Sequence, residues 1–215
     1  MRTKSDQIKV SSRKEYSTFP KQISDLCVDL FLRDAQVVVD AFAGWGERNL
    51  SVKESGKTYI GFDLSKEAIE HAKKVYGVEN IHGDSLKVDV PTHDGFITCP
   101  PYFDLEVYDN ENGLDKLNSW DEFLSDYRAI LQRFSEKATT GAKYCIITGD
   151  WRHKGIYYDL TFQTQKIMSE LGFKQFDSVI LSRKKKTNYP IMIPQAKRLG
   201  YTVKLHETLN VWVKV

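Results

Sequence analysis

Two consecutive prolines near the middle of the chain restrict its fold more than any other feature. Pro100 and Pro101 follow the run Phe-Ile-Thr-Cys at 96–99 and precede Tyr102. Neither proline has a backbone N–H, so the pair can continue neither a helix nor a central strand. The pattern predicts a strand that ends in a stiff turn, whose carbonyl groups and neighbouring ring suit a planar, amine-bearing group. A plain surface loop is the alternative interpretation.

A second motif, upstream of the prolines, predicts a turn that binds a nucleoside. The β-branched run at 37–39 is typical of a buried strand, and Gly44 and Gly46 allow a tight turn from it into a helix. Such a turn brings backbone N–H groups close to the ligand. A nicotinamide-dinucleotide fingerprint has a third small residue where this chain has Asn49, which disfavours that cofactor.

Acidic residues follow three successive predicted strands. Asp40 ends the first strand, Asp63 follows the strand at 57–62, and Asp84 follows the strand at 79–82. Each acid alone could be a helix cap or a turn residue. Because the carboxyl ends of parallel strands meet at one edge of a sheet, the three acids and the glycine turn together predict a cofactor site.

The rest of the chain alternates between strands and helices. Helices are expected to begin near Pro20, after the cap Ser65, at the capping box Ser-Trp-Asp-Glu of 119–122 and near Asp159; Gly77 is expected to end the second of them. Strands are expected near 36–42, 57–62, 79–82, 94–98, 143–148, 175–182 and 205–213. The alternation predicts one domain over 17–215 with a mainly parallel sheet, whose last two strands pair antiparallel. Residues 1–16 are predicted to form a flexible arm.

The order of these motifs resembles that of the S-adenosylmethionine-dependent DNA amino-methyltransferases, which methylate N4 of cytosine or N6 of adenine. The motifs are Asp-x-Phe-x-Gly-x-Gly at 40–46, Phe-Asp at 62–63, Gly-Asp at 83–84 and Cys-Pro-Pro-Tyr at 99–102. Phe19-Pro20 and the segment 206–214 also look like parts of this family. The resemblance implies a Rossmann-like class I methyltransferase: an α/β fold with a mostly parallel seven-stranded sheet, an antiparallel last strand and helices on both faces.

The resemblance also implies S-adenosylmethionine as cofactor and assigns residues to it. Phe42, Gly44 and Gly46 would line its methionine and ribose side. Asp63 would bind the ribose hydroxyls and Asp84 the adenine amine. Asp40 would either order the glycine loop or bind the amino group of the methionine.

Four residues of the proline motif carry the catalytic assignment. In the resembling enzymes, the first side chain of the motif and the first proline carbonyl accept hydrogen bonds from the base amine, and the tyrosine stacks on the base. Here these are Cys99, Pro100 and Tyr102, with Pro101 completing the turn. Sulfur is a weak acceptor compared with the oxygen that the family usually has at this position. Serine is nearly isosteric with cysteine, and the serine form of the motif is typical of cytosine enzymes. This favours cytosine slightly, and adenine stays open. A covalent role for Cys99 is disfavoured, because cytosine-C5 enzymes place cysteine after the proline.

Two segments outside the predicted scaffold, 103–118 and 183–203, are candidates for DNA contact. Both are long and lie at the ligand end of the sheet. Basic clusters could contact phosphates or could form a solvated face. The predicted nucleic-acid-binding residues are Phe103, Arg152, Lys154, Arg183, Lys184, Lys185 and Lys186.

Composition narrows the remaining choices. The net charge is only +2, so positive charge is local. The chain has three cysteines and no apolar run near the roughly 20 residues of a membrane span, which predicts a cytoplasmic protein without disulfides, metal or membrane contact. DNA is the predicted partner, and monomer and homodimer both stay open. The alternative functions are methylation of RNA or of a protein glutamine, or a catalytically weak subunit that binds S-adenosylmethionine or nucleic acid.

Overall fold

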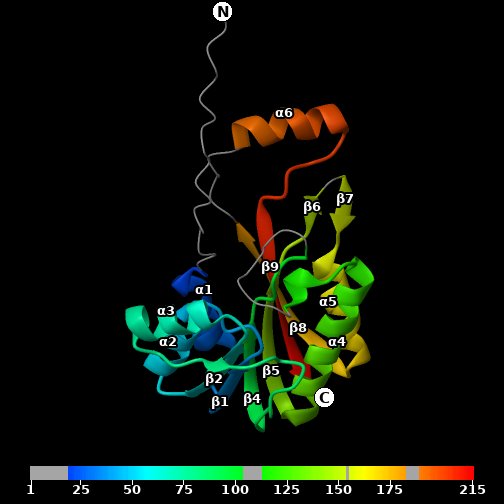
Figure 1. Ribbon diagram of the computed structural model, residues 1–215. Coiled ribbons are helices and arrows are strands. Elements are labelled where there is room, and N and C mark those ends of the chain that lie inside the picture. The colour runs from blue at the N-terminus through cyan, green and yellow to red at the C-terminus, as the bar shows by residue number, and fades with distance from the viewer. Residues whose placement is uncertain (1–18, 104–112, 154, 183–188) are drawn as a thin grey trace, which may run out of the picture.

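The computed structural model describes residues 19–103, 113–153, 155–182 and 189–215 (Figure 1). Its centre is a seven-stranded sheet with the order β3-β2-β1-β4-β5-β9-β8. The strands are β1 (Val37–Asp40), β2 (Thr58–Asp63), β3 (Ile81–His82), β4 (His93–Thr98), β5 (Ala138–Thr148), β8 (Phe173–Ser182) and β9 (His206–Lys214).

The pairing directions confirm the predicted fold class. The β1–β2, β2–β3, β1–β4 and β4–β5 pairs are parallel, whereas β9 runs antiparallel to both β5 and β8. The last strand of the chain is therefore the antiparallel one, inserted between β5 and the edge strand β8. The carboxyl ends of β1, β2, β4 and β5 meet at one edge of the sheet, which is where ligands bind in such folds.

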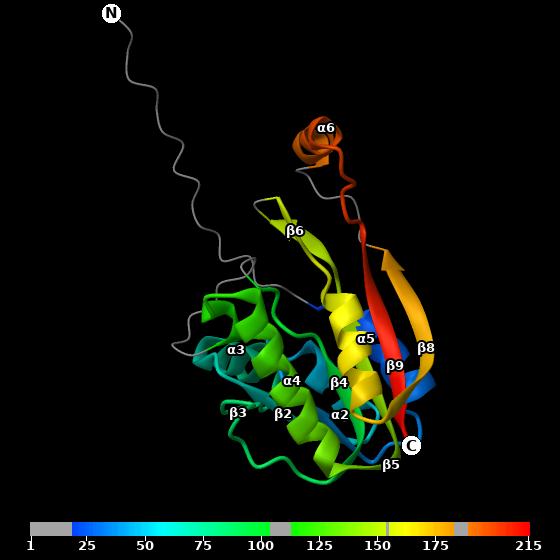
Figure 2. The same ribbon diagram turned by 90° about the vertical axis from the view of Figure 1, so that its right-hand side faces the viewer.

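Helices cover both faces of the sheet (Figures 1 and 2). One face carries α1 (Lys21–Leu26), which continues as a π-helical turn η1 (Cys27–Phe31), with α2 (Glu47–Glu54) and α3 (Lys66–Tyr76). The other face carries α4 (Trp120–Lys137) and α5 (Leu160–Glu170). Adjacent residues of β4 point to opposite faces. Phe96 accordingly packs in the core beneath α4 and α5, and Ile97 packs in the core beneath η1.

Predicted caps define the ends of two helices. Ser65 Oγ accepts a hydrogen bond from the Ala68 N–H at 3.1 Å, and Gly77 ends α3 in the left-handed conformation at φ +63°. Ser119 Oγ accepts from the Glu122 N–H at 3.2 Å at the start of α4. The Glu122 carboxylate accepts from the Asn118 N–H instead of that of Ser119, so one half of the predicted capping box forms.

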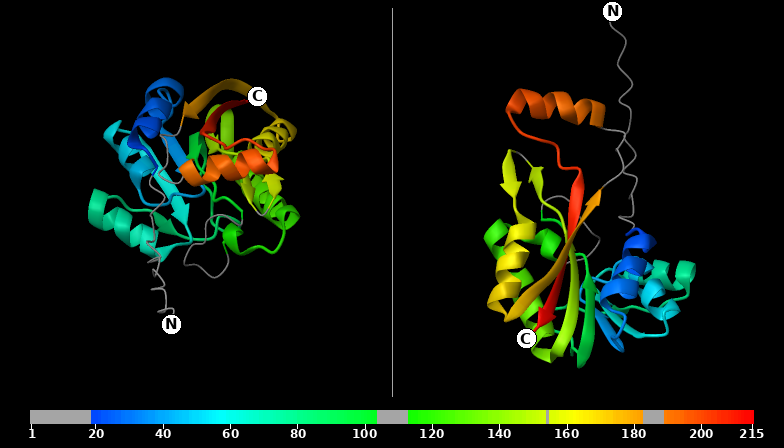
Figure 3. Two further views of the ribbon diagram at one scale, coloured as in Figure 1. Left: turned by 90° about the horizontal axis from the view of Figure 1, so that it is seen from above. Right: turned by 180° about the vertical axis from the view of Figure 1, so that it is seen from behind.

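The structure adds two elements that the sequence patterns do not predict. The hairpin β6 (Trp151–His153) and β7 (Ile156–Tyr158) follows β5, and α6 (Tyr189–Leu199) lies within the segment 183–203 (Figure 3). The two prolines at 190 and 194 indicate a loop. Pro190, however, lies in the first turn of α6, where its missing N–H costs nothing, and Pro194 lies inside the helix. In the segment 103–118, the structure describes a 3₁₀ turn, η2 (Leu114–Lys116). The N-terminal segment 1–16, predicted to be flexible, lies outside the described residues.

His93, at the start of β4, is a buried neutral histidine. Only 2% of it is exposed, Nδ1 lies 2.8 Å from the Pro91 carbonyl oxygen, and Nε2 lies 2.7 Å from the Tyr144 hydroxyl. A carbonyl only accepts, so Nδ1 carries the proton and Nε2 accepts from the tyrosine. Burial lowers the pKa of His93.

We therefore expect His93 to weaken the fold under acid conditions. Below the ordinary histidine pKa of about 6.5, the unfolded chain binds a proton that the native imidazole resists, so the free energy of unfolding falls by up to about 1.4 kcal/mol per pH unit. Urea unfolding at pH 7.5 and pH 5.5 measures this loss. It should be smaller in His93→Gln, which has no titrating group. Equal losses in the two proteins would contradict the assignment.

Candidate active site

A pocket opens at the carboxyl ends of the strands and joins the two motifs of the sequence. Its volume is about 690 Å³, including the open space at its mouth. The glycine-turn side contributes Ala41 and Phe42, and the diproline corner contributes Cys99 and Pro101. The remaining lining residues are Asp63, Leu64, Gly83, Asp84, Ser85, Leu86, Gly113, Leu114, Asp126 and Ile130.

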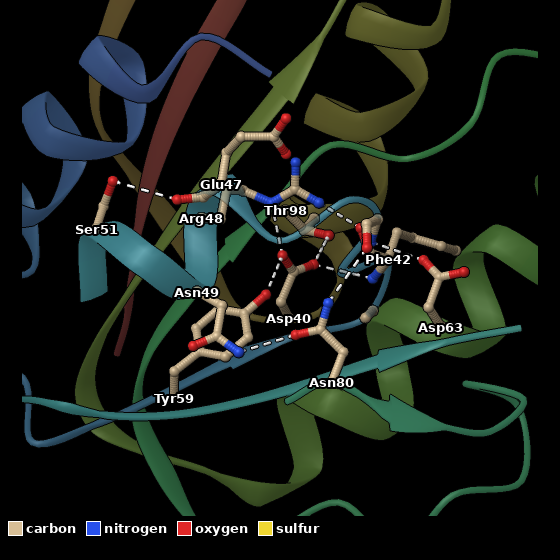
Figure 4. A network of polar contacts seen from close by, with 12 residues as sticks. Asp40, Phe42, Glu47, Arg48, Asn49, Ser51, Tyr59, Asp63, Asn80 and Thr98 are labelled. Carbon is tan, nitrogen blue, oxygen red and sulfur yellow. Dashed lines mark hydrogen bonds and ion pairs between the residues drawn. The ribbon is translucent and has the colours of Figure 1, made fainter. Parts of the chain in front are cut away.

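The Asp40 carboxylate organises the floor beside this pocket (Figure 4). Asp40 is 0% exposed, and Oδ1 accepts from the Phe42 N–H at 2.9 Å and the Thr98 hydroxyl at 2.6 Å. Oδ2 accepts from Arg48 Nε at 2.6 Å and the Tyr59 hydroxyl at 2.9 Å. The carboxylate thus ties the glycine turn to β2, α2 and the end of β4. Of the two roles predicted for Asp40, these contacts correspond to ordering the loop.

Arg48 is the buried cation that balances Asp40. It is 5% exposed, donates a second hydrogen bond to the Phe42 carbonyl, and lies over the Phe19 ring at 4.9 Å from the centroid. Burial disfavours the charged guanidinium, but the neighbouring Asp40 carboxylate more than offsets this, so the pKa of Arg48 is raised. Arg48 stays charged and fixes the backbone of the turn from inside.

A hydrogen bond between Gly44 and Asp63 is the second interaction that fixes the glycine turn. Gly44 has φ +57°, and its N–H donates to Asp63 Oδ2 at 2.7 Å. Asp63 Oδ1 accepts from the Ser65 N–H at 2.8 Å. Burial raises the pKa of Asp63. A carboxylate has about four acceptor positions, so Asp63 can hold both N–H groups and still accept from ligand hydroxyls in the pocket that it lines.

Gly46 has a packing role that differs from the predicted one. It has φ +106°, and a Cβ added there would lie 2.7 Å from the Cβ of Ala72 in α3. Glycine therefore lets α2 approach α3. Nearby, the Asn80 amide donates to the Gly44 carbonyl at 3.2 Å, and Asn49 donates to the Asn80 side-chain oxygen at 2.9 Å. Asn49, at the position where a dinucleotide fingerprint has a small residue, thus supports the turn.

Asp84 lies on the pocket wall that follows β3. Its Oδ1 accepts from the Leu86 N–H at 3.0 Å, and Oδ2 pairs with Lys87 at 3.0 Å. The Ser85 hydroxyl donates to the Ala41 carbonyl at 2.6 Å, which fastens this loop to the end of β1. Asp63 and Asp84 therefore face the same pocket from neighbouring strands, as the sequence predicts.

The diproline corner begins where the sequence predicts, because β4 ends at Thr98. Tyr102, beyond the corner, is only 6% exposed. Its hydroxyl donates to Glu207 Oε1 at 2.7 Å, and its ring meets Trp151 edge-on with 5.1 Å between centroids. Tyr102 is thus held inside the protein, which does not support its predicted stacking on a base.

Phe103 is the clearest departure from the predicted nucleic-acid contacts. The ring is 7% exposed and packs against Trp120, Phe123 and Tyr158 at centroid distances of 5.9, 5.7 and 5.5 Å. After the corner, the chain turns back onto α4 and buries this ring. Arg152 is exposed on the β6–β7 hairpin, as a nucleic-acid contact requires. Lys154, Arg183, Lys184, Lys185 and Lys186 lie outside the described residues.

A family model matches the N-terminal third of the chain. The family model described as DNA methylase (N6_N4_Mtase) matches residues 3–74, which contain the glycine turn and Asp63. Over that stretch, about a third of the chain, the match confirms the resemblance to the DNA amino-methyltransferases. No curated protein matches the chain.

Solved structures match the chain over nearly its whole length. Magnesium protoporphyrin IX methyltransferase from Synechocystis PCC 6803, with bound S-adenosylmethionine, has 13% identity and TM-score 0.57, with 91% of this chain and 79% of that chain covered. An S-adenosylmethionine-dependent methyltransferase from Methanosarcina mazei has 9% identity and TM-score 0.59, with 92% and 98% covered. The fold is that of an S-adenosylmethionine-dependent methyltransferase.

The methyltransferase fold does not by itself select a substrate. TrmN from Thermus thermophilus also matches, with 14% identity and TM-score 0.56; the alignment covers 91% of this chain and 49% of that one. The predicted cofactor agrees with the methyltransferase neighbours, several of which contain S-adenosylmethionine or S-adenosylhomocysteine. The substrate has to be inferred from the residues around the pocket.

The sequence patterns do not predict several of the residues that line the pocket. Asp126 and Ile130 reach the pocket from α4. Ile130 is one of the apolar residues that α4 buries, whereas Asp126 only neighbours another of them, Tyr127, and no sequence signal marks it. In the described residues, no group of three or more His, Cys, Asp or Glu side chains could hold a metal ion. None of the described helices has the length and apolarity to cross a bilayer.

The Asp40 network should dominate the stability of the site. Asp40→Asn removes the charge that compensates buried Arg48, so we expect a loss of about 3–5 kcal/mol in the free energy of unfolding, measured with urea. The matched control is Asp25→Asn, which removes an exposed ion pair with Lys21 (2.8 Å) and should change stability little. Similar losses in the two variants would contradict the role given to Asp40.

Proposed function

We propose that the protein transfers a methyl group from S-adenosylmethionine to the exocyclic amino group of a base in DNA. One observation carries the proposal: residues of the glycine turn and of the diproline corner line the same pocket. The match to the DNA methylase model supports the choice of DNA. Cytosine N4 and adenine N6 are the two candidate acceptors.

The pocket residues suit the proposed cofactor. Asp63 would accept from the ribose hydroxyls, and Asp84 from the adenine amine. Leu86 and Ile130, on the same lining, supply apolar contact for a flat ring. The cofactor, when bound, supplies a methyl group already activated on a sulfonium sulfur.

The protein's own part in the reaction is to hold the acceptor amine. The lone pair of an exocyclic amine is conjugated into the base, so the amine is a poor nucleophile. Hydrogen bonds from its two N–H groups to the Cys99 sulfur and the Pro100 carbonyl would turn the lone pair out of conjugation. Positioning of this kind can supply much of the rate. The base must leave the duplex first, at a cost of a few kcal/mol.

Tyr102 has a positioning role in this proposal. Glu207 holds its hydroxyl and Trp151 covers its ring edge, which fixes the chain directly after Pro100 and Pro101. The carbonyl that accepts from the base amine is thereby held rigid. This role replaces the predicted stacking on the base.

Methyl transfer to DNA is the direct test. Purified protein is incubated with S-adenosylmethionine carrying a labelled methyl group and unmethylated DNA, and the digested DNA is read by mass spectrometry. We expect label in N4-methylcytosine or N6-methyladenine. Asp63→Ala should abolish the label by weakening cofactor binding, whereas Asp177→Ala, on the exposed edge strand β8, should retain it. Label in RNA or in protein, with none in DNA, would contradict the proposal.

Cys99→Ser should strengthen catalysis. An oxygen acceptor replaces the weaker sulfur at nearly the same size, and a neutral hydrogen bond is worth about 1 kcal/mol, so we expect kcat to rise about fivefold. The affinity for S-adenosylmethionine, measured by calorimetry, should stay unchanged because the substitution acts on the base. A lower kcat with unchanged cofactor affinity would show that the thiol itself is required.

A further inference from the structure

An arm stands out from the sheet on the side of the pocket (Figures 1 and 3). It consists of the β6–β7 hairpin and of residues 189–206, which comprise α6 and the chain that leads into β9. In Figures 1 and 2 and in the right panel of Figure 3, α6 lies beyond the carboxyl ends of the parallel strands, and the hairpin extends toward it. The arm is therefore placed where a large ligand at the pocket would pass.

Stacked cations and aromatic rings join the two parts of the arm. The Arg152 guanidinium lies 5.4 Å from the Tyr157 ring centroid and 4.8 Å from that of Tyr201. Lys204 Nζ lies 4.8 Å from the Tyr157 centroid. The Tyr157 hydroxyl donates to Asp150 Oδ2 at 2.7 Å. The hairpin and the chain after α6 thus hold each other, and the cations are oriented before any ligand arrives.

Residues at the base of the arm contact Tyr102, directly after the diproline corner. Trp151 begins the hairpin and packs edge-on against Tyr102. Glu207 follows the arm in β9 and accepts the Tyr102 hydroxyl hydrogen. Each part of the arm is therefore connected at one end to a residue that contacts Tyr102, the tyrosine beside Pro101. A ligand held by the arm would be aligned with the corner.

The charge of the arm differs from that of the rest of the molecule. Residues 151–158 and 189–206, which make up the arm, contain five Lys and Arg residues and no Asp or Glu. The whole chain has 31 Lys and Arg against 29 Asp and Glu, so the remainder has 26 basic and 29 acidic residues. Such an asymmetry directs a polyanion to one part of the surface.

We propose that the arm binds the phosphates of duplex DNA beside the target base, through Arg152, Lys204 and the exposed Lys197 and Arg198. The proposal rests on the proposed function and deepens it by assigning the surface that holds the DNA. A guanidinium stacked on an aromatic ring keeps its in-plane N–H groups for phosphate oxygens. Arg152 uses one of them on the Gly155 carbonyl at 2.8 Å, and the others are available to a backbone.

The test is the salt dependence of binding to a labelled duplex of mixed sequence, with the full chain. Each phosphate contact contributes about 0.9 to the slope of log affinity against log salt. Arg152→Gln and Lys204→Gln should each reduce the slope by about one and weaken binding alike for all sequences. Lys143→Gln is the matched control, because Lys143 lies 4.7 Å from the Phe176 ring centroid, outside the arm; its slope should stay unchanged.

Variants of Tyr201 test whether the stacking of Arg152 on this ring matters, apart from the positive charge of the arm. Tyr201→Phe keeps the ring and should bind like the wild type, whereas Tyr201→Ala should weaken binding several-fold. Thermal melting of every variant shows whether it remains folded. Equal slopes in the arm variants, the control and the wild type would overturn the proposal. It would also be overturned if single-stranded DNA or duplex RNA bound more tightly than duplex DNA and this binding depended on the arm residues.

The methyl-transfer assay keeps this proposal distinct from the proposed function. If wild-type protein methylates DNA and the arm variants keep its salt slope, the arm assignment is wrong and the function stands. If the arm variants lose slope but no DNA is methylated, the arm binds DNA and the proposed chemistry is wrong.

Discussion

The buried Asp40 carboxylate is the interaction on which the rest of the site depends. Its two oxygens accept from the turn, from β2, from α2 and from the last residue of β4. A charge with 0% exposure is tolerated because Arg48 compensates it and every contact is a hydrogen bond. Loops after β1 and β4 come from distant parts of the sequence, and this carboxylate sets their separation. The shared pocket follows from that separation.

The second constraint lies at Tyr102, directly after the diproline corner. Trp151 begins the hairpin and Glu207 follows the α6 segment, so both parts of the arm contact the tyrosine that holds the diproline corner. Aromatic packing continues from Trp151 to Trp120 and Tyr158, which ties the corner to α4 as well. The corner is therefore rigid for reasons beyond its prolines, and its rigidity depends on residues far along the chain.

Much of the fold could be predicted from local patterns, because strand runs, caps and the glycine turn act over a few residues. The predicted strand at 94–98 and the Ser65 and Gly77 helix ends are found in the structure. The failures required tertiary information. Phe103 is among the predicted DNA contacts, but its ring packs against Phe123 of α4 and is buried. Asp126 reaches the pocket only because α4 crosses it, and no motif marks that crossing.

The division of the pocket explains why cofactor and substrate are specified so differently. Solved methyltransferases match at 9–14% identity, so what they share with this chain is backbone geometry. The cofactor side is made of that geometry: a left-handed Gly44, backbone N–H groups and strand-end carboxylates such as Asp63. In the proposed function, the substrate side combines the Cys99 side chain and the Pro100 carbonyl with the cations around Arg152. Side chains can change while the sheet stays the same, so under this proposal the choice of substrate depends on the corner and the arm.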